Sequence, residues 1–319
     1  MRRQAPDTAT ADRRSAARDP ESVGPHVAVC VCTYQRPDLL GQLLTELGRQ
    51  DTRAGFSYSI VVADNDRRRT AQDVVARFSA SSPVAVTYCV EPEQNIALAR
   101  NRAIEHAHGD YIAFIDDDEF PGADWLAAML GACEKFGAEG VLGPVRPFFA
   151  EPPPGWLLKS RLCERPEHAT GTWLHWRQTR SGNVLFRRGI LEGAEPPFRR
   201  EFGHGGEDQD FFGRMMQRGW RFVWCNEAGV FEVVPPERRR RRYFWKRALR
   251  RGQNEKPWLN ARSVLTSLVA VPAYAAFLPL ACLLGQHVIM DCSVRLLDHL
   301  GRLLGAVGVR PCHGRYLGA

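Results

Sequence analysis

The chain has 319 residues, of which 44% are hydrophobic and 25% are charged, a composition typical of a folded protein. This length suffices for one large α/β domain with additions or for two modest domains. The hydrophobic content is high enough to form a packed core, so we do not expect the chain as a whole to be disordered. The net charge of +7 is local, because residues 237–262 hold eleven Lys or Arg and two Glu (+9), which leaves about −2 elsewhere. A uniformly basic nucleic-acid coat is therefore excluded.

The N-terminus and the cysteines both argue against secretion. The first 24 residues are rich in Arg, Ala, Asp and Ser and lack the central apolar run of a secretory signal, so we predict that residues 1–24 form a disordered arm. A transit peptide would share the Arg and Ala content, but four acidic residues in this stretch argue against one. The nine scattered cysteines include no C-x-x-C pair, so a disulfide framework and a structural zinc site are both disfavoured. A reducing compartment fits this pattern best.

Short apolar runs alternate with helical patterns between residues 26 and 115. The predicted strands are 26–32, 57–63, 84–90 and 111–115. The predicted helices are 38–50, 70–79 and 96–108. Strands that alternate with helices imply βαβ units, so the sequence predicts an α/β fold with a mostly parallel sheet flanked by helices.

Acidic clusters follow two of these strands. Asp64-Asn65-Asp66 comes directly after the second strand, and Asp116-Asp117-Asp118-Glu119 comes directly after the fourth. Ligands bind beyond the carboxyl ends of the strands of an open α/β sheet, so both clusters are candidates for a binding site. Asp64 has two interpretations, as an acceptor for a base or a ribose, or as the first residue of an Asx turn.

The acidic run at 116–119 gives the strongest prediction. Residues two apart share one side of an extended chain, so Asp116 and Asp118 are predicted to face one pocket. Divalent cations such as Mg²⁺ or Mn²⁺ prefer oxygen ligands and often bridge a carboxylate to substrate phosphates. The alternative is a solvated acidic turn, which the preceding apolar strand disfavours.

A third candidate lies far along the chain, at Gly205-Gly206-Glu207-Asp208. It precedes a short predicted helix over 210–218, and its glycines allow unusual backbone angles. Asp208 is a candidate general base, because a carboxylate can take a proton from an attacking hydroxyl. The alternative is an acidic residue that caps the helix.

The C-terminal third joins a basic segment to an apolar one. Residues 264–290 contain no Asp, Glu, Lys or Arg and exceed the ~20 residues of a spanning helix, although Pro272 and Pro279 leave a re-entrant or in-plane helix open. The basic segment, 237–262, favours attraction to anionic lipids on the cytoplasmic side of a membrane. The alternatives are a pair of buried core helices for 264–290, and a nucleic-acid patch or a solvated face for Arg238 to Arg242.

Taken in order, these motifs resemble the inverting family 2 glycosyltransferases of GT-A fold. The resemblance spans roughly residues 27–225, and the ordered set of motifs is highly specific. The matching stretches are Val29 to Pro37, Val61 to Asp66, Asn95 to Asn101, Tyr111 to Glu119 and Gly206 to Asp208. The dense run from Asn95 to Glu119, with Glu232 to Pro236 later, resembles the bacterial exopolysaccharide branch and its succinoglycan glucosyltransferases.

The resemblance implies how the candidate residues would bind a nucleotide-sugar. Thr33 and Arg36 would line the nucleotide pocket, and Arg100 would approach the nucleotide from its helix. Asp64 would bind uracil or its ribose. Asp116 would contact the ribose or the metal.

The resemblance also implies a divalent cation and a catalytic base. Asp118 would hold Mn²⁺ or Mg²⁺ on the diphosphate, and Asp208 would be the base. Many relatives carry a His on the strand after the Glu-Asp motif, where this chain has Glu232. Glu232 could bind the metal but would not neutralise phosphate, which leaves that task to the adjacent arginines.

We therefore expect five divisions after the arm. They are a nucleotide-sugar-binding half (25–130), an acceptor-binding half with the catalytic base (131–236), a basic juxtamembrane segment (237–262), membrane-associated helices (263–310) and a tail (311–319).

The expected activity is transfer of one sugar from a UDP-sugar, with UDP-glucose as the first candidate, to a glycan or lipid-linked acceptor at the cytoplasmic face of the cell membrane. Processive synthases of this superfamily carry Gln-x-x-Arg-Trp, which this sequence lacks. A sugar-phosphate nucleotidyltransferase is the rival enzyme, but it would need a Gly-rich loop where Cys32 to Pro37 contains no glycine. A non-catalytic nucleic-acid or membrane adaptor would leave the acidic clusters unexplained, so no nucleic-acid partner is expected.

Overall fold

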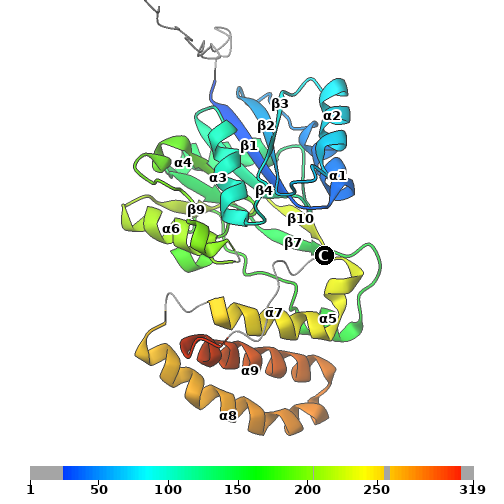
Figure 1. Ribbon diagram of the computed structural model, residues 1–319, viewed down its shortest axis with the longest axis vertical. Coiled ribbons are helices and arrows are strands. Elements are labelled where there is room, and N and C mark those ends of the chain that lie inside the picture. The colour runs from blue at the N-terminus through cyan, green and yellow to red at the C-terminus, as the bar shows by residue number, and fades with distance from the viewer. Residues whose placement is uncertain (1–23, 204, 255–258, 310–319) are drawn as a thin grey trace, which may run out of the picture.

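The computed structural model describes residues 24–203, 205–254 and 259–309 (Figure 1). The arm expected over residues 1–24, apart from Gly24, and the tail expected over 311–319 lie outside these residues.

Within the described residues, seven strands form one central sheet in the order β3-β2-β1-β4-β8-β6-β9. The strands are β1 (His26–Thr33), β2 (Ser57–Asp64), β3 (Val86–Val90), β4 (Tyr111–Asp116), β6 (Gly140–Leu142), β8 (Val184–Arg187) and β9 (Phe222–Trp224). Only β8 among them runs antiparallel to its neighbours, β4 and β6. The prediction of a mostly parallel α/β sheet is confirmed.

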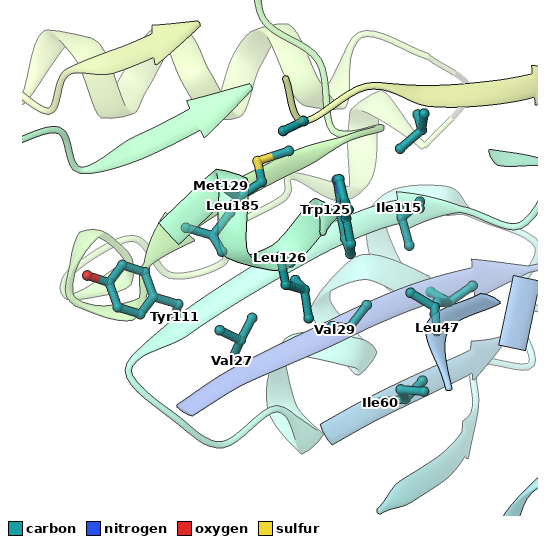
Figure 2. Close-up of a cluster of buried hydrophobic side chains, with 14 of the residues drawn as sticks. Val27, Val29, Leu47, Ile60, Tyr111, Ile115, Trp125, Leu126, Met129 and Leu185 are labelled. Carbon is teal, nitrogen blue, oxygen red and sulfur yellow. The ribbon is translucent and has the colours of Figure 1, made fainter. Parts of the chain in front are cut away.

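Helices cover both faces of the sheet because residues alternate in direction along each strand. In β1, Val27 and Val29 belong to a core shared with α1 (Pro37–Leu47) and α4 (Trp125–Phe136), whereas Ala28 and Cys30 face α3 (Ile96–His106) and α6 (Glu207–Gln217). Figure 2 shows the first of these cores, in which Trp125 packs over the strands. Helix α2 (Gln72–Ser81) packs beside α1.

A small second sheet lies beside the carboxyl end of the central one, in the order β5-β10-β7. Its strands are β5 (Glu119–Pro121), β7 (Val145–Phe148) and β10 (Val230–Val233). The antiparallel register of β5 and β10 pairs Glu119 with Glu232. Residues more than 110 positions apart in the sequence are thereby brought together.

Two expected boundaries differ from the structure. The helix expected over 210–218 begins at Glu207, so Glu207 and Asp208 form its first turn rather than a preceding loop. The division between residues 130 and 131 falls inside α4, and β6, β8 and β9 complete the sheet that β1 to β4 begin. The two expected halves therefore share one sheet. A short helix, α5 (Gly155–Ser160), packs against the last helix of the described chain, α9 (Gln286–Ala306).

Three helices, α7 (Arg241–Asn254), α8 (Ala261–Leu284) and α9 (Gln286–Ala306), form a layer beyond the carboxyl end of the central sheet (Figure 1). Helix α9 packs between α7 and α8. The contact between α7 and α9 is close at Gly252 of α7, because a Cβ there would lie 2.1 Å from the carbonyl oxygen of Asp298 in α9. The expected apolar segment 264–290 is not one helix, because Gly285 (φ +110°) separates α8 from α9. Pro272 and Pro279 lie inside α8 without ending it.

Helix α8 has the length and composition to cross a membrane, and among the described residues it is the one helix that does. Its side chains are largely exposed, with Leu265, Val269 and Leu283 at 64%, 65% and 82%. A core helix would bury these side chains, so the alternative of a buried helix pair does not describe α8.

Candidate active site

The carboxyl ends of β1 and β4 form one side of the site. The two strands are parallel neighbours in which Cys32 pairs with Asp116, so the residues that follow each strand meet. The Thr33 hydroxyl donates to Asp117 Oδ2 at 2.8 Å. The Arg36 guanidinium donates to Asp117 Oδ1 at 3.0 Å and to Asp118 Oδ2 at 3.1 Å. The structure therefore places Thr33 and Arg36, which were predicted for the nucleotide pocket, in one cluster with Asp118, which was predicted for the metal.

Asp118 lies at the centre of this cluster. Its carboxylate is buried between Arg36 and Arg238, whose guanidinium nitrogen lies 3.3 Å from Asp118 Oδ2. The pKa of Asp118 is raised to about 7, first by burial and then by the negative charges of Asp117 and Glu232, whereas Arg238 lowers it. A cation bound beside Asp118 would therefore stabilise its ionised carboxylate.

Glu119 and Glu232 extend the cluster onto the small sheet. Glu232 is ion-paired with Arg165 and accepts a hydrogen bond from Arg238 at 3.0 Å. Glu119 is fully buried, and its Oε2 accepts from the backbone N–H of Asp116 at 3.2 Å. Burial raises the pKa of Glu119 well above its ordinary value, and the charge of Asp116 adds to this effect.

The carboxylate oxygens of this cluster were predicted to bind a divalent cation. Within the described ranges, no group of three or more His, Cys, Asp or Glu side chains is arranged as a preformed metal site. The donor chemistry nevertheless fits, because Glu119 Oε1 is buried with no hydrogen-bond partner among the described residues. A Cβ on Gly182 would lie 2.7 Å from this atom and 3.0 Å from Asp116 Oδ2, so the glycine leaves space beside two carboxylate oxygens.

Arg100 joins this cluster to the candidate base. It projects from α3, whose N-terminus is capped by the Asn95 side chain. The buried guanidinium forms an ion pair with Glu207 and lies 3.8 Å from Asp116 Oδ1. Arg100 was expected to approach the nucleotide, and the structure places it between two carboxylates of the chain.

Asp208 stands in the first turn of α6. Gly205 (φ +126°) and Gly206 (φ +94°) adopt left-handed conformations that turn the chain into the helix, as the Gly-Gly pair led us to expect. Burial raises the pKa of Asp208; Arg100 lowers it, and the charge of Asp116 raises it. The first turn of α6 is linked to Asp116 through Arg100, which pairs with Glu207 and lies 3.8 Å from Asp116 Oδ1. Asp208 also lines a cavity of about 1000 Å³ between α6 and the C-terminal layer.

Asp64 occupies a different environment from the other candidates. It is fully buried, its Oδ1 accepts from the Asp66 backbone N–H at 3.0 Å, and its Oδ2 accepts from the Ala71 N–H and the Tyr88 hydroxyl. This is the Asx-turn alternative for Asp64. Binding of uracil or ribose by Asp64 stays a prediction, and in this structure Asp66 is the aspartate of the cluster that lines the neighbouring cavity.

Three members of the site were not singled out from the sequence. Arg165 lies in a loop without periodicity, and no local signal marks it as the partner of Glu232. Glu119 was quoted in the acidic run but given no role, although the alternation of strand β5 turns it towards Glu232. Arg238 was grouped with the basic segment, and its pairing with Asp118 and Glu232 places it in the site.

Comparisons with known proteins identify the family of the chain. A family model described as "Glycosyl transferase family 2" matches residues 28–193. The chain is 34% identical to the succinoglycan biosynthesis protein ExoM of Rhizobium meliloti over 232 residues, which are 72% of this chain and 73% of that protein.

Solved structures share the fold at lower identity. The mannosyltransferase PcManGT from Pyrobaculum calidifontis, in complex with GDP-Man and Mn²⁺, gives a TM-score of 0.54 at 21% identity over 89% of this chain and 73% of that one. S. aureus TarS 1-349 in complex with UDP-GlcNAc gives 0.53 at 15% identity over 88% of this chain and 90% of that one. By sequence and by fold, the chain belongs to glycosyl transferase family 2 and is a glycosyltransferase.

Proposed function

We propose that this chain is an inverting, non-processive glycosyltransferase that moves one sugar from a UDP-sugar to a lipid-linked glycan. The observation that carries the proposal is the position of Arg100, whose guanidinium bridges Asp116 at the end of β4 and Glu207 beside Asp208. Through this arginine, the acidic end of the sheet and the first turn of α6 border one space. A reaction between two substrates needs such a shared space.

Donor binding rests on the end of β1. Thr33 and Arg36 are held against Asp117, so their positions are fixed before a ligand arrives. An arginine can bind phosphate oxygens with two parallel hydrogen bonds, and Arg36 and Arg238 both lie beside Asp118. The complexes of the two structural neighbours with UDP-GlcNAc and GDP-Man support a nucleotide-sugar donor.

The oxygens of Asp116, Asp118 and Glu119 would hold a divalent cation, with Glu232 beside them on β10. When bound, Mn²⁺ or Mg²⁺ neutralises charge that develops on the leaving nucleoside diphosphate. The Mn²⁺ in the mannosyltransferase complex supports this part of the proposal.

Asp208 would act as the general base. It takes the proton of the acceptor hydroxyl while that oxygen bonds to the anomeric carbon and the bond to the nucleotide phosphate breaks. A single displacement from the opposite face inverts the anomeric configuration. Burial raises the pKa of Asp208, and a base with a raised pKa accepts a proton more readily.

A membrane-bound acceptor is supported by the C-terminal layer. Helix α8 exposes apolar side chains along its length, and α7 carries much of the basic segment. Apolar burial and attraction of arginines to anionic lipids together would hold the enzyme on the cytoplasmic face of a membrane.

A thermal-shift panel of UDP-, GDP- and dTDP-sugars with and without Mn²⁺ tests the donor, because a bound ligand raises the melting temperature. We expect the largest shift with a UDP-sugar and Mn²⁺ together. Proton NMR of the product then reports the anomeric configuration. No shift with any nucleotide-sugar, or a product that retains the donor's configuration, contradicts the proposal.

A further inference from the structure

A cavity of about 1000 Å³ lies between the first turn of α6 and the three helices of the C-terminal layer. Its described lining is strongly basic, with six guanidinium groups and one carboxylate, that of Asp208. The arginines are Arg177, Arg247, Arg250, Arg251, Arg262 and Arg302. We refer to this space as the arginine cavity.

Guanidinium groups outnumber carboxylates six to one in this lining. Arg251 forms an ion pair with Asp298, Arg302 donates to the Ser267 hydroxyl at 3.2 Å, and Arg177 stacks on the Trp176 ring at 4.9 Å. Like charges around one space repel each other, and the repulsion is stronger where protein replaces water. The arginine cavity is therefore suited to an anion.

The lining favours a phosphate group over other anions. Guanidinium groups bind phosphate oxygens with paired hydrogen bonds, and several of them can share one diphosphate. At the start of α8, Asn260 adds a side-chain amide to the lining. Ser263 and Thr266 also line the cavity, and their hydroxyls donate to backbone carbonyl oxygens of the helix at 2.8 Å. A diphosphate offers more acceptor oxygens than a carboxylate, so it can use more of these donors.

Helix α8 connects the arginine cavity to an apolar surface. Its first turns line the cavity, and the exposed side chains of Leu265, Leu268 and Val269 begin within the same stretch. A ligand that combines an anionic group with a hydrocarbon chain could use both parts of the helix.

We propose that the arginine cavity binds the phosphate or diphosphate group of an amphiphilic acceptor, whose hydrocarbon chain follows α8 and whose sugar hydroxyl reaches Asp208. The inference rests on the proposed function and assigns a site to the charged linkage of the acceptor. Asp208 lines the cavity and directly follows Glu207, the ion-pair partner of Arg100, so an acceptor held here presents its hydroxyl towards the donor.

Calorimetry on the full chain in neutral detergent micelles tests the proposal. The probes are farnesyl diphosphate, farnesol and inorganic pyrophosphate, each titrated with and without saturating UDP and Mn²⁺. We expect farnesyl diphosphate to bind at least about tenfold more tightly than either single part, with UDP present or absent. The double variant Arg247→Gln/Arg262→Gln should weaken this binding by about tenfold or more, because it removes charged hydrogen-bond donors.

The matched control is Arg53→Gln/Arg77→Gln, which removes the same charge from exposed positions outside the arginine cavity. It should bind farnesyl diphosphate as the wild type does, and UDP affinity should be equal in all three proteins. Equal affinity of the cavity variant for farnesyl diphosphate overturns the proposal, as does displacement of the lipid by UDP. Pyrophosphate or farnesol binding as tightly as farnesyl diphosphate overturns the amphiphilic part. Failure of UDP to bind the wild type counts instead against the proposed donor, since the titrations without UDP still report on the cavity.

Discussion

Replacement of Arg100 by Met should destabilise the protein in a pH-dependent manner. The Arg100 and Glu207 side chains are 7% and 8% exposed and form an ion pair, so the variant leaves a buried carboxylate without its cation. Removal of one partner of a buried pair costs about 3–5 kcal/mol. Burial already raises the pKa of Glu207 to about 7, and Arg100 is the group that lowers it, so the pKa rises further in the variant.

The sign of the pH dependence follows from this shift. Because the pKa of Glu207 is higher in the folded state than its ordinary value, the folded variant binds a proton that the unfolded chain releases. Below pH 7 Glu207 is protonated in both folded proteins, so their stabilities fall in parallel as the pH rises. Above pH 7 only the stability of the variant continues to fall, until its own higher pKa is passed. We expect the free energy of unfolding of Arg100→Met to fall below that of the wild type by the full cost at pH 8.5 and by clearly less at pH 5.5.

Urea unfolding followed by tryptophan fluorescence at the two pH values measures these differences. Arg49→Met is the control, because Arg49 is 65% exposed and pairs with Glu46, whose side chain is 38% exposed; an exposed pair contributes about 0–1 kcal/mol. The double variant Arg100→Met/Glu207→Met should be less destabilised than Arg100→Met at pH 8.5, since no charge is left buried. A cost for Arg100→Met equal to that of Arg49→Met at both pH values would refute the reasoning.

Three further predictions concern the metal, the base and the membrane. Asp118→Asn should lower turnover at least about tenfold at fixed Mn²⁺ and leave the melting temperature near that of the wild type, and full activity of this variant in EDTA would refute a metal role. In a profile of kcat against pH, the acid limb should lie above the ordinary pKa range of aspartate, because Asp208 must be deprotonated to act and its pKa is raised. An acid limb at or below pH 4 would count against Asp208. The protein should stay with membranes in a 1 M salt wash, where the Debye length is ~3 Å and the attraction between charges is screened. Leu268→Asp/Leu283→Asp should reduce retention, because it places charges on the exposed face of α8. Release of the wild type by salt alone would refute insertion.

The sequence was most informative where local pattern and position agree. The apolar strand before Asp116 and the alternation of carboxylates after it suffice to predict an acidic site at the end of β4, and the structure has the cluster there. The same reasoning leaves Asp64 open, because an aspartate after a strand serves equally as a ligand and as the first residue of a turn. Its hydrogen bonds to Ala71 and Tyr88 decide the environment, and neither partner is visible from the local sequence.

Contacts between distant segments account for most of what the sequence left open. Glu232 was placed from the family motif, but only the register of β10 against β5 shows that it faces Glu119. Arg165 comes from a loop whose path no periodicity determines. The break at Gly285 was missed because the apolar run continues past it, although a glycine with positive φ is a common helix terminator.

The central claim is that Asp208 acts on the acceptor while separate residues bind the donor. The direct test measures UDP affinity by calorimetry and transfer rate in Asp208→Asn, with Mn²⁺ present in both assays. A general base contributes about 10²–10⁴-fold to the rate, so we predict a loss of turnover of at least about 100-fold with UDP affinity within about twofold of the wild type. A variant that loses UDP affinity in proportion to its activity, or that keeps its turnover, would contradict the account.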